Sequence, residues 1–314
     1  MTQNIDRFLS AFNTYLKDFN VPIPPKPSYP LIFILGMSRS GTTLLYQTLV
    51  KHLRLGYPNN LIARFWSNPC VGIFLSRSIL GSHKSISFQS SFGNTPTITD
   101  PHEFGHFWKH WFDFRSDSAD VLSSEQLSRI DWAGLARVLR DMTRCFGLPV
   151  LFKQLALSFQ AHRLSIELPE SRFIYIYRPS YEIASSILKT RRERHGSDAF
   201  WFGLKPPKWQ QLHDLPPLEQ IRKQVDVCTG LIREQIETIK ADQLYTIDFN
   251  DLKKHPMSSV QKVKAKFRLH YDLSDQVHDR NSASYFDCRI SEKEIAFFSK
   301  NLQEDRDRPL FYHH

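Results

Sequence analysis

The sequence contains little of what secreted, zinc-bound or membrane-spanning proteins usually carry. Its 314 residues include four cysteines and no C-x-x-C pair. A zinc knuckle therefore has no support, and scattered cysteines of this kind are typical of reduced thiols in a cytoplasmic protein. No apolar run reaches the roughly 18–20 residues that span a bilayer. Charged residues such as Asp6 and Lys17 interrupt the N-terminal region, so no signal peptide is expected either. We expect a cytoplasmic protein without a membrane span.

The charge balance favours an anionic ligand. Hydrophobic residues make up 41% of the chain and charged residues 23%, which is ordinary globular composition, and the net charge is +9. This charge alone does not choose among a nucleotide, a nucleic acid and a membrane surface. The cations are spread along the chain, and the densest cluster, Lys189–His195, is interrupted by Glu193. We interpret that cluster as a solvated helix end, with a rim attracting an anionic cofactor as the alternative, and expect no nucleic-acid partner.

Apolar strand patterns alternate with helical patterns along the chain. Helical spacing is found at 4–19, near 101–112, and at 124–146, 161–168, 180–194, 217–240 and 257–269. The expected strands are LIFIL at 31–35, PVLFKQ at 149–154, SRFIYIYR at 171–178 and LYTIDF at 244–249. Such alternation predicts an α/β, P-loop-type three-layer fold with a central parallel sheet flanked by helices.

The first strand leads into GMSRSGTT, residues 36–43, and then into a helix expected over 42–53. The loop has the two glycines of the nucleotide-binding pattern G-x-x-x-x-G-K-[ST], but Thr42 stands at the lysine position. Loop amides and a helix N-terminus bind anions by geometry and dipole alone. Without the lysine, cleavage of a nucleoside triphosphate is disfavoured. Arg39 and the nearby hydroxyls suit a terminal monophosphate; the alternative is a corner that merely needs small residues.

The segment Arg39–Leu45 resembles the 5′-phosphosulfate loop, [KR]-S-G-T-T-x-[LM], of sulfotransferases that use 3′-phosphoadenosine 5′-phosphosulfate (PAPS). The bacterial and tyrosyl-protein branches look nearest. The resemblance implies PAPS as cofactor, 3′-phosphoadenosine 5′-phosphate (PAP) as product, and no metal. The implied contacts to the 5′ end come from Arg39, Ser40, Gly41, Thr42, Thr43 and Leu44.

Three further segments extend the resemblance over about 31–267. FIYIYRPSYEIASSIL has the family's strand-terminal Arg178 with Ser186 eight residues on, a pair that would hold the 3′-phosphate; Pro179 allows a one-residue slip, which leaves Ser185 as the alternative. PVLFKQLALSF implies that Lys153 contacts the sulfonate, but Leu155 stands where the cytosolic branch has its catalytic His. TIDFNDLKKHP is similar to the family's closing YEDL…P segment.

The general base has to come from elsewhere. TDPHEFGHFWKHWF contains a formal H-E-x-x-H, His102 to His106, which on one helix could bind zinc. Gly105 weakens that helix, and no third ligand is evident, so we expect no metal. Glu103 is the first candidate for the base, followed by His106 and His102. The alternative is that Glu103 only complements a helix dipole.

The sequence thus predicts one sulfotransferase domain over 1–314, with acceptor-binding insertions at 56–122 and 196–216 and a C-terminal tail at 274–314. We expect transfer of the sulfonate group from PAPS to a hydroxyl or amine of a soluble small-molecule or carbohydrate acceptor. Two alternatives stay open. One is a P-loop nucleotide kinase or NTPase, and the other is a catalytically degenerate protein that binds PAPS or PAP. The oligomeric state is left open.

Overall fold

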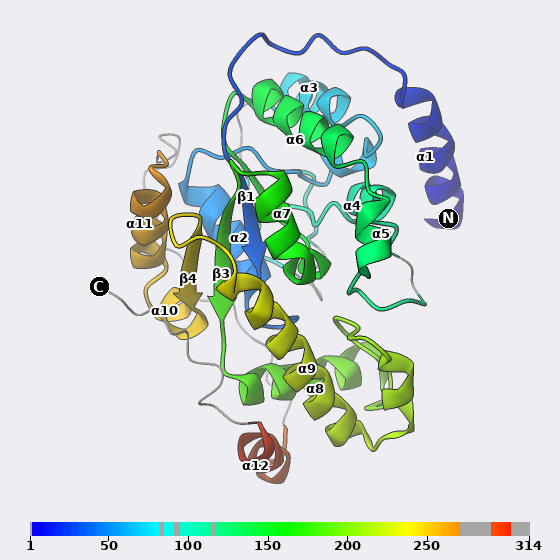
Figure 1. Cartoon of the computed structure of the whole chain (residues 1–314), viewed down its shortest axis with the longest axis vertical. Coiled ribbons are helices and arrows are strands. Elements are labelled where there is room, and N and C mark those ends of the chain that lie inside the picture. Colours follow the sequence, from blue (N-terminus) through cyan, green and yellow to red (C-terminus); the bar gives the residue numbers. More distant parts are fainter. Residues whose placement is uncertain (1, 82–84, 91–94, 115–116, 271–289, 303–314) are drawn as a thin grey trace.

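The computed structural model describes residues 2–81, 85–90, 95–114, 117–270 and 290–302 (Figure 1). Its centre is a four-stranded sheet in the order β2-β1-β3-β4, with every neighbouring pair parallel. The strands are β1 (Leu31–Leu35), β2 (Val150–Lys153), β3 (Arg172–Tyr177) and β4 (Leu244–Asp248). All four coincide with the strands expected from the sequence, and the α/β prediction is confirmed.

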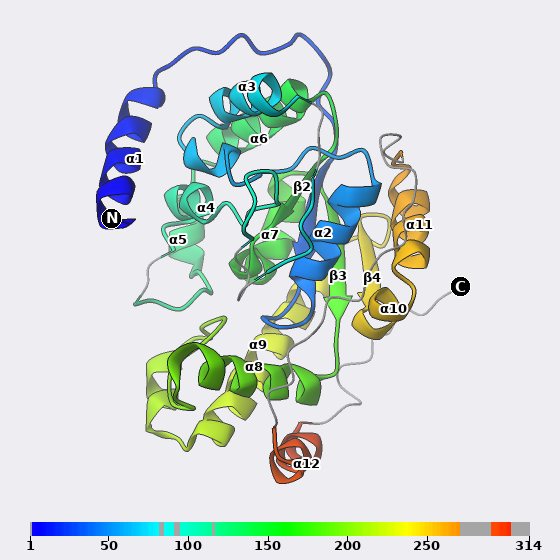
Figure 2. The same cartoon turned by 180° about the vertical axis from the view of Figure 1, so that it is seen from behind.

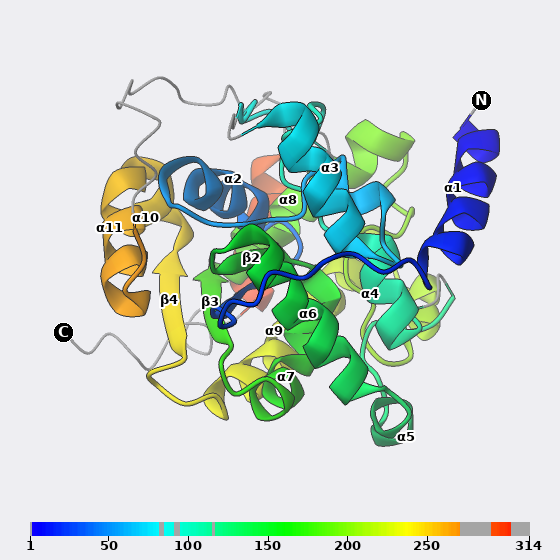
Figure 3. The same ribbon diagram turned by 90° about the horizontal axis from the view of Figure 1, so that it is seen from above.

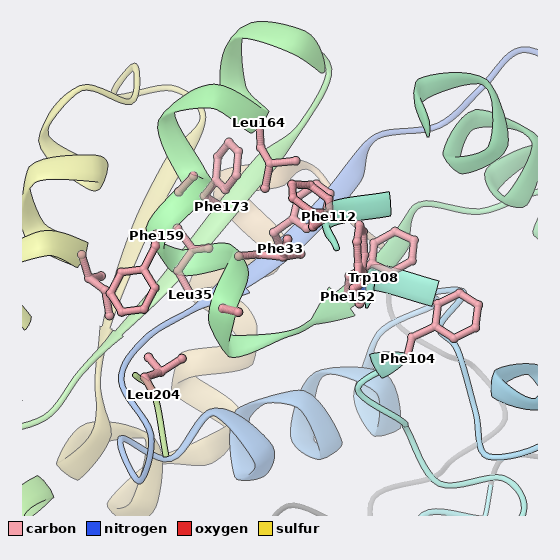
Figure 4. Packing of buried hydrophobic residues seen from close by; sticks show 14 of the residues in the cluster. Phe33, Leu35, Phe104, Trp108, Phe112, Phe152, Phe159, Leu164, Phe173 and Leu204 are labelled. Carbon is pink, nitrogen blue, oxygen red and sulfur yellow. The ribbon is translucent and has the colours of Figure 1, made fainter. Parts of the chain in front are cut away.

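Alternating side chains of the strands build two separate hydrophobic layers. In β1, Phe33 and Leu35 face one layer, while Ile32 and Ile34 face the other. The first layer includes stacked rings of Phe33, Phe152 and Phe173 from three neighbouring strands (Figure 4). A strand that is buried on both faces has to be apolar throughout, which explains the uninterrupted run LIFIL. The result is the three-layer arrangement, helices on both sides of one sheet (Figure 3).

Different helices cover the two faces. The face of Phe33 is covered mainly by α6 (Trp132–Phe146), α7 (Ala161–Glu167) and α9 (Pro217–Glu237). The opposite face is covered by α2 (Thr42–His52), α10 (Phe249–Lys254) and α11 (Pro256–Phe267) (Figure 2). The other α-helices are α1 (Thr2–Leu16), α3 (Pro69–Leu80), α4 (Gly105–Phe112), α5 (Ser124–Ser128), α8 (Ser180–His195) and α12 (Glu292–Asn301); the 3₁₀ helices are η1 (Ile62–Arg64), η2 (Leu155–Gln160) and η3 (Trp209–Asp214). No helix in the described ranges combines the length and apolarity needed to cross a bilayer.

Several helices differ from the sequence expectation. Helix α3 lies in the segment 56–122, for which the sequence predicted a helix only near 101–112. Its Gly72 lets α3 approach the backbone of Ile62, since a Cβ there would lie 3.1 Å from the Ile62 Cα. The single helix expected over 124–146 is two helices, because the Asp131 side chain accepts the Gly134 N–H at 2.8 Å and starts α6 anew. The residues DLKKHP, for which the sequence predicted neither helix nor strand, lie largely in α10, and the segment 196–216 contains η3.

The C-terminal tail predicted at 274–314 is only partly described. Within it, α12 begins at a capping box in which the Ser291 and Glu294 side chains bond each other's backbone N–H groups. The rest of the tail lies outside the described residues.

Strand order predicts that a ligand would bind at the carboxyl ends of the strands. The chain passes from β1 to β2 on one side of β1 and then from β2 to β3 on its other side, so the strand order reverses at β1. Parallel α/β sheets bind ligands at the carboxyl ends of the strands where such a reversal occurs. The loop 36–41 follows β1, Lys153 ends β2, Arg178 follows β3, and Phe249 follows β4. All four therefore lie at the carboxyl ends of the parallel strands, which form one edge of the sheet.

Candidate active site

The loop after β1 is closed by its own backbone. The carbonyl of Met37 accepts both the N–H of Ser40, at 3.1 Å, and its hydroxyl, at 2.7 Å. Arg39 adopts φ 69°, a left-handed conformation that is uncommon for a residue with a side chain. Gly41 follows at φ 98°, and a Cβ at this position would overlap the ring of Phe249. Ser40 therefore shapes the loop in this structure, and its N–H is already bonded.

Beyond Gly41 lie backbone donors that have no acceptor among the described residues. Helix α2 begins at Thr42, and its first intrahelical bond runs from the Leu45 N–H to the Gly41 carbonyl at 3.0 Å. The N–H groups of Thr42, Thr43 and Leu44 consequently have no intrahelical acceptor. No described side chain caps this helix end. A turn of unpaired donors at the positive end of a helix is suited to binding an anion such as a phosphate.

A buried lysine stands beside this helix end. Lys153, the last residue of β2, is 3% exposed, and its ammonium donates to the Thr43 hydroxyl at 3.2 Å. It also forms an ion pair with Glu103, whose side chain is 33% exposed. A buried ammonium needs such partners to remain charged. The site thus joins a fixed cation, a hydroxyl and a partly open carboxylate at the mouth of the loop.

Aromatic packing positions Glu103. Helix α4 is anchored by Trp108, which is fully buried with its ring edge-on to Phe33, at 6.1 Å, and to Phe152, at 5.5 Å (Figure 4). Phe104, just before the helix, is also buried, and its backbone is in the left-handed region at φ 60°. Glu103, the preceding residue, is thereby held next to Lys153 at the end of β2.

The H-E-x-x-H segment does not lie on one helix. Pro101 pairs with Asn59 in an isolated bridge, and α4 begins only at Gly105. The helix expected from about 101 is therefore shorter, and His102 and His106 do not share a helical face. In the described part of the chain, no three His, Cys, Asp or Glu side chains gather as a metal-binding group.

The two histidines have different surroundings. The Nδ1 atom of His102 accepts the Phe104 N–H at 2.8 Å, so the proton of the ring belongs on Nε2. Burial lowers the pKa of this imidazole, and the Glu103 carboxylate opposes that shift. His106 is exposed and stacks on Trp66 with ring centres 4.7 Å apart. Of the three base candidates, Glu103 is the one that contacts Lys153.

A second group lies where β3 meets α8. Arg178 donates from Nη1 to the carbonyl of Arg39 at 2.8 Å, and Arg39 Nε donates to the Ser186 hydroxyl at 3.0 Å. These two hydrogen bonds join the loop 36–41 to Arg178 and to α8. The Ser185 hydroxyl is buried and has no partner among the described residues. Of the two serines, Ser186 is the one that faces the loop.

Several residues around the loop 36–41 were not predicted from the sequence. Phe249 packs under Gly41 and covers the guanidinium of Arg178, with the ring centre 4.4 Å from Cζ. The Ser158 hydroxyl accepts the Gly36 N–H at 3.0 Å. Ser38 accepts the Leu204 N–H, also at 3.0 Å, which ties the segment 196–216 to the loop. The segment TIDFNDL contained Phe249, but nothing local signalled the two serine contacts.

Comparison with known families identifies the chain. A model described as the sulfotransferase family matches residues 30–272, well over half of the sequence. The chain belongs to the sulfotransferase family. The match confirms the resemblance found in the sequence and favours sulfonate transfer over the kinase or NTPase interpretation. No curated protein matches the chain.

Solved structures of several sulfotransferases are distantly similar. STF1 from Mycobacterium tuberculosis H37Rv is 17% identical with a TM-score of 0.49, over 79% of this chain and 69% of that one. STF9 from Mycobacterium avium is 13% identical with a TM-score of 0.48, over 82% and 67%. The sulfotransferase from Alicyclobacillus acidocaldarius is 16% identical with a TM-score of 0.42, over 80% and 87%. Similarity at this level transfers no residue roles.

Proposed function

We propose that this sulfotransferase uses PAPS as its donor and transfers the sulfonate to a hydroxyl or amine of a small-molecule or carbohydrate acceptor, releasing PAP. The observation that carries the proposal is the convergence of the open amides of α2, the buried Lys153 ammonium and the Arg178 guanidinium at one edge of the sheet. These are three separate groups for anionic oxygens, as expected for a nucleotide with phosphates at both its 5′ and 3′ positions.

The residues present fit such a donor. The amides at Thr42 to Leu44 would hold the 5′-phosphate, and Arg178 with Ser186 would hold the 3′-phosphate. A guanidinium and a hydroxyl are well suited to a phosphate dianion. When bound, PAPS supplies an activated sulfonate whose bond to the 5′-phosphate is broken.

Two cations would stabilise the negative charge that develops during sulfonate transfer. Lys153 is fixed by Thr43 and Glu103, and Arg39 is held in place by Ser186 and by its left-handed backbone. Cations already fixed before the reaction lose little reorganisation energy when negative charge grows on the leaving phosphate and sulfonate oxygens. Both cations would therefore stabilise the negative charge that develops on these oxygens as the sulfonate is transferred.

Glu103 would take the proton of the acceptor. Its carboxylate contacts Lys153, the cation expected at the sulfonate, and this contact supports Glu103 as the base. Leu155, at the position of the cytosolic branch's histidine, begins η2 and packs against the core, so it offers no alternative base. The carboxylate would accept the proton at an oxygen as the acceptor attacks sulfur. The segments 56–122 and 196–216 would select the acceptor.

The test is incubation with ³⁵S-labelled PAPS and a panel of hydroxyl and amine acceptors that includes sugars, with Lys153→Ala as the comparison. We expect labelled product from at least one acceptor, and release of PAP well above that of Lys153→Ala. A wild-type protein that binds PAP, yet releases it from PAPS no faster than Lys153→Ala does with any acceptor or with none, would instead establish the degenerate binding protein.

A further inference from the structure

The guanidinium of Arg178 is held on three sides. Its Nε donates to Glu182, in the first turn of α8, at 2.9 Å, and its Nη1 donates to the Arg39 carbonyl at 2.8 Å. The ring of Phe249 covers one face, with its centre 4.4 Å from Cζ. An arginine side chain otherwise samples many rotamers, and ordering it on ligand binding costs free energy. Here that ordering precedes the ligand.

The arrangement leaves three N–H donors of the guanidinium without an acceptor among the described residues. Arginine has five N–H donors in a plane, and Glu182 and the Arg39 carbonyl use two of them. The other three have no acceptor among the described residues. Glu182 binds at Nε, so its carboxylate leaves both N–H groups of Nη2 and the second N–H of Nη1 for a phosphate. The side chains of Arg178 and Glu182 are 19% and 23% exposed, so their ion pair is largely shielded from water.

We propose that Glu182 is a positioning residue that aims Arg178 at the 3′-phosphate and thereby sets the preference for 3′-phosphorylated nucleotides. The inference rests on the proposed function. Glu182 itself would touch no ligand. Its effect passes through the orientation of Arg178, and it is therefore confined to ligands that carry the 3′-phosphate.

A competing role for Glu182 predicts the opposite result. If Glu182 were a built-in substitute for the phosphate, its removal would free Arg178 and tighten PAP binding. If it positions Arg178, its removal weakens PAP binding, while glutamine, which keeps an oxygen acceptor for Nε–H, largely preserves it. Two substitutions at one position therefore separate the two roles.

The experiment measures calorimetric affinities for PAP and for adenosine 5′-phosphate, which differ only in the 3′-phosphate, in the wild type, Glu182→Ala and Glu182→Gln. Glu219→Ala is the matched control, because Glu219 forms a similarly exposed pair with Arg222, three residues on in α9. We expect Glu182→Ala to weaken PAP about 5- to 20-fold, the range of a lost supporting hydrogen bond. Adenosine 5′-phosphate should stay within about twofold, and Glu182→Gln and the control should stay near wild type for both ligands.

Three outcomes would overturn the assignment: tighter PAP binding in Glu182→Ala, unchanged PAP binding, or equal loss for both nucleotides. The last would indicate a general structural role, which melting curves of the same variants would show independently. Wild-type protein that does not distinguish PAP from adenosine 5′-phosphate would overturn this assignment together with the Arg178 role in the proposed function. A wild-type preference for PAP that is undiminished in Glu182→Ala overturns this assignment alone.

Discussion

The substitution Glu103→Gln tests the proposed base. The amide keeps the shape of the side chain and can still accept a hydrogen bond from Lys153, but it cannot take a proton at neutral pH. A positioned general base contributes about 10²- to 10⁴-fold. We therefore expect turnover to fall by about 100- to 10,000-fold, which is about 2.7–5.4 kcal/mol at 1.36 kcal/mol per tenfold.

The same substitution should change PAP binding little and lower stability moderately. Lys153 keeps its bond to Thr43 and an oxygen acceptor at position 103, but its buried ammonium loses a charged partner. We expect a stability loss of about 1–3 kcal/mol, in the range of a buried group that loses a charged partner, and PAP affinity within about threefold of wild type. PAP affinity would shift towards tighter binding, since Lys153 is no longer neutralised by a carboxylate.

The assay compares initial rates of PAP formation from PAPS with a fixed acceptor, alongside calorimetric PAP affinity and melting temperature. Glu125→Gln is the control, because Glu125 pairs with Arg129 on the surface, where both side chains are more than 70% exposed. Turnover of Glu103→Gln within threefold of wild type would refute the base role. A loss of turnover that follows entirely from lost PAP affinity would refute it equally.

Three further perturbations test other parts of the molecule. Arg178→Ala should weaken PAP by about 1.5–3 kcal/mol, a lost charge-assisted contact, and leave adenosine 5′-phosphate nearly unaffected; calorimetry showing equal losses would contradict the 3′-phosphate role. Gly41→Ala should destabilise the fold by about 2–4 kcal/mol in denaturant melts, because its φ of 98° and the Phe249 ring both exclude a Cβ; wild-type stability would show that the loop can move aside. Pairing with Arg192 lowers the pKa of Glu294 to about 2, so this carboxylate stabilises the fold above its ordinary pKa, and that contribution is lost as pH falls towards 2. Glu294→Gln should accordingly flatten the pH dependence of stability between about 4.5 and 2, and unchanged acid melts would contradict the contribution of this pair.

The strands and the loop 36–41 could be predicted because the sequence patterns that indicate them are local. LIFIL is apolar at every position since both faces are buried, and the glycine, serine and threonine run that follows needs only its own residues to be recognised. Helix α3 was missed because its Gly72 lowers local helix propensity, and the reason for that glycine is contact with η1 in three dimensions. Likewise, the break between α5 and α6 depends on one cap, Asp131.

The residues of the candidate site also divide into those that local signals predict and those that they do not. Arg39, Lys153 and Arg178 could be predicted because they lie at or soon after the ends of strands, in segments that resemble family motifs. The pairing of Glu103 with Lys153 joins residues 50 positions apart and depends on the packing of α4 through Trp108. Such long-range contacts leave no periodic trace in a single sequence. The choice between Ser185 and Ser186 depends on the rotation of α8, which is set by packing in three dimensions.

Binding of a nucleotide that carries both a 5′- and a 3′-phosphate is the property on which the proposed function depends. Calorimetric titration with PAP, with ATP and magnesium as comparator, tests it most directly. We expect micromolar binding of PAP with little response to ATP. Tight binding of ATP with PAP ignored would contradict it, because the open amides of α2 would then serve a triphosphate and Arg178 would have no 3′-phosphate to hold.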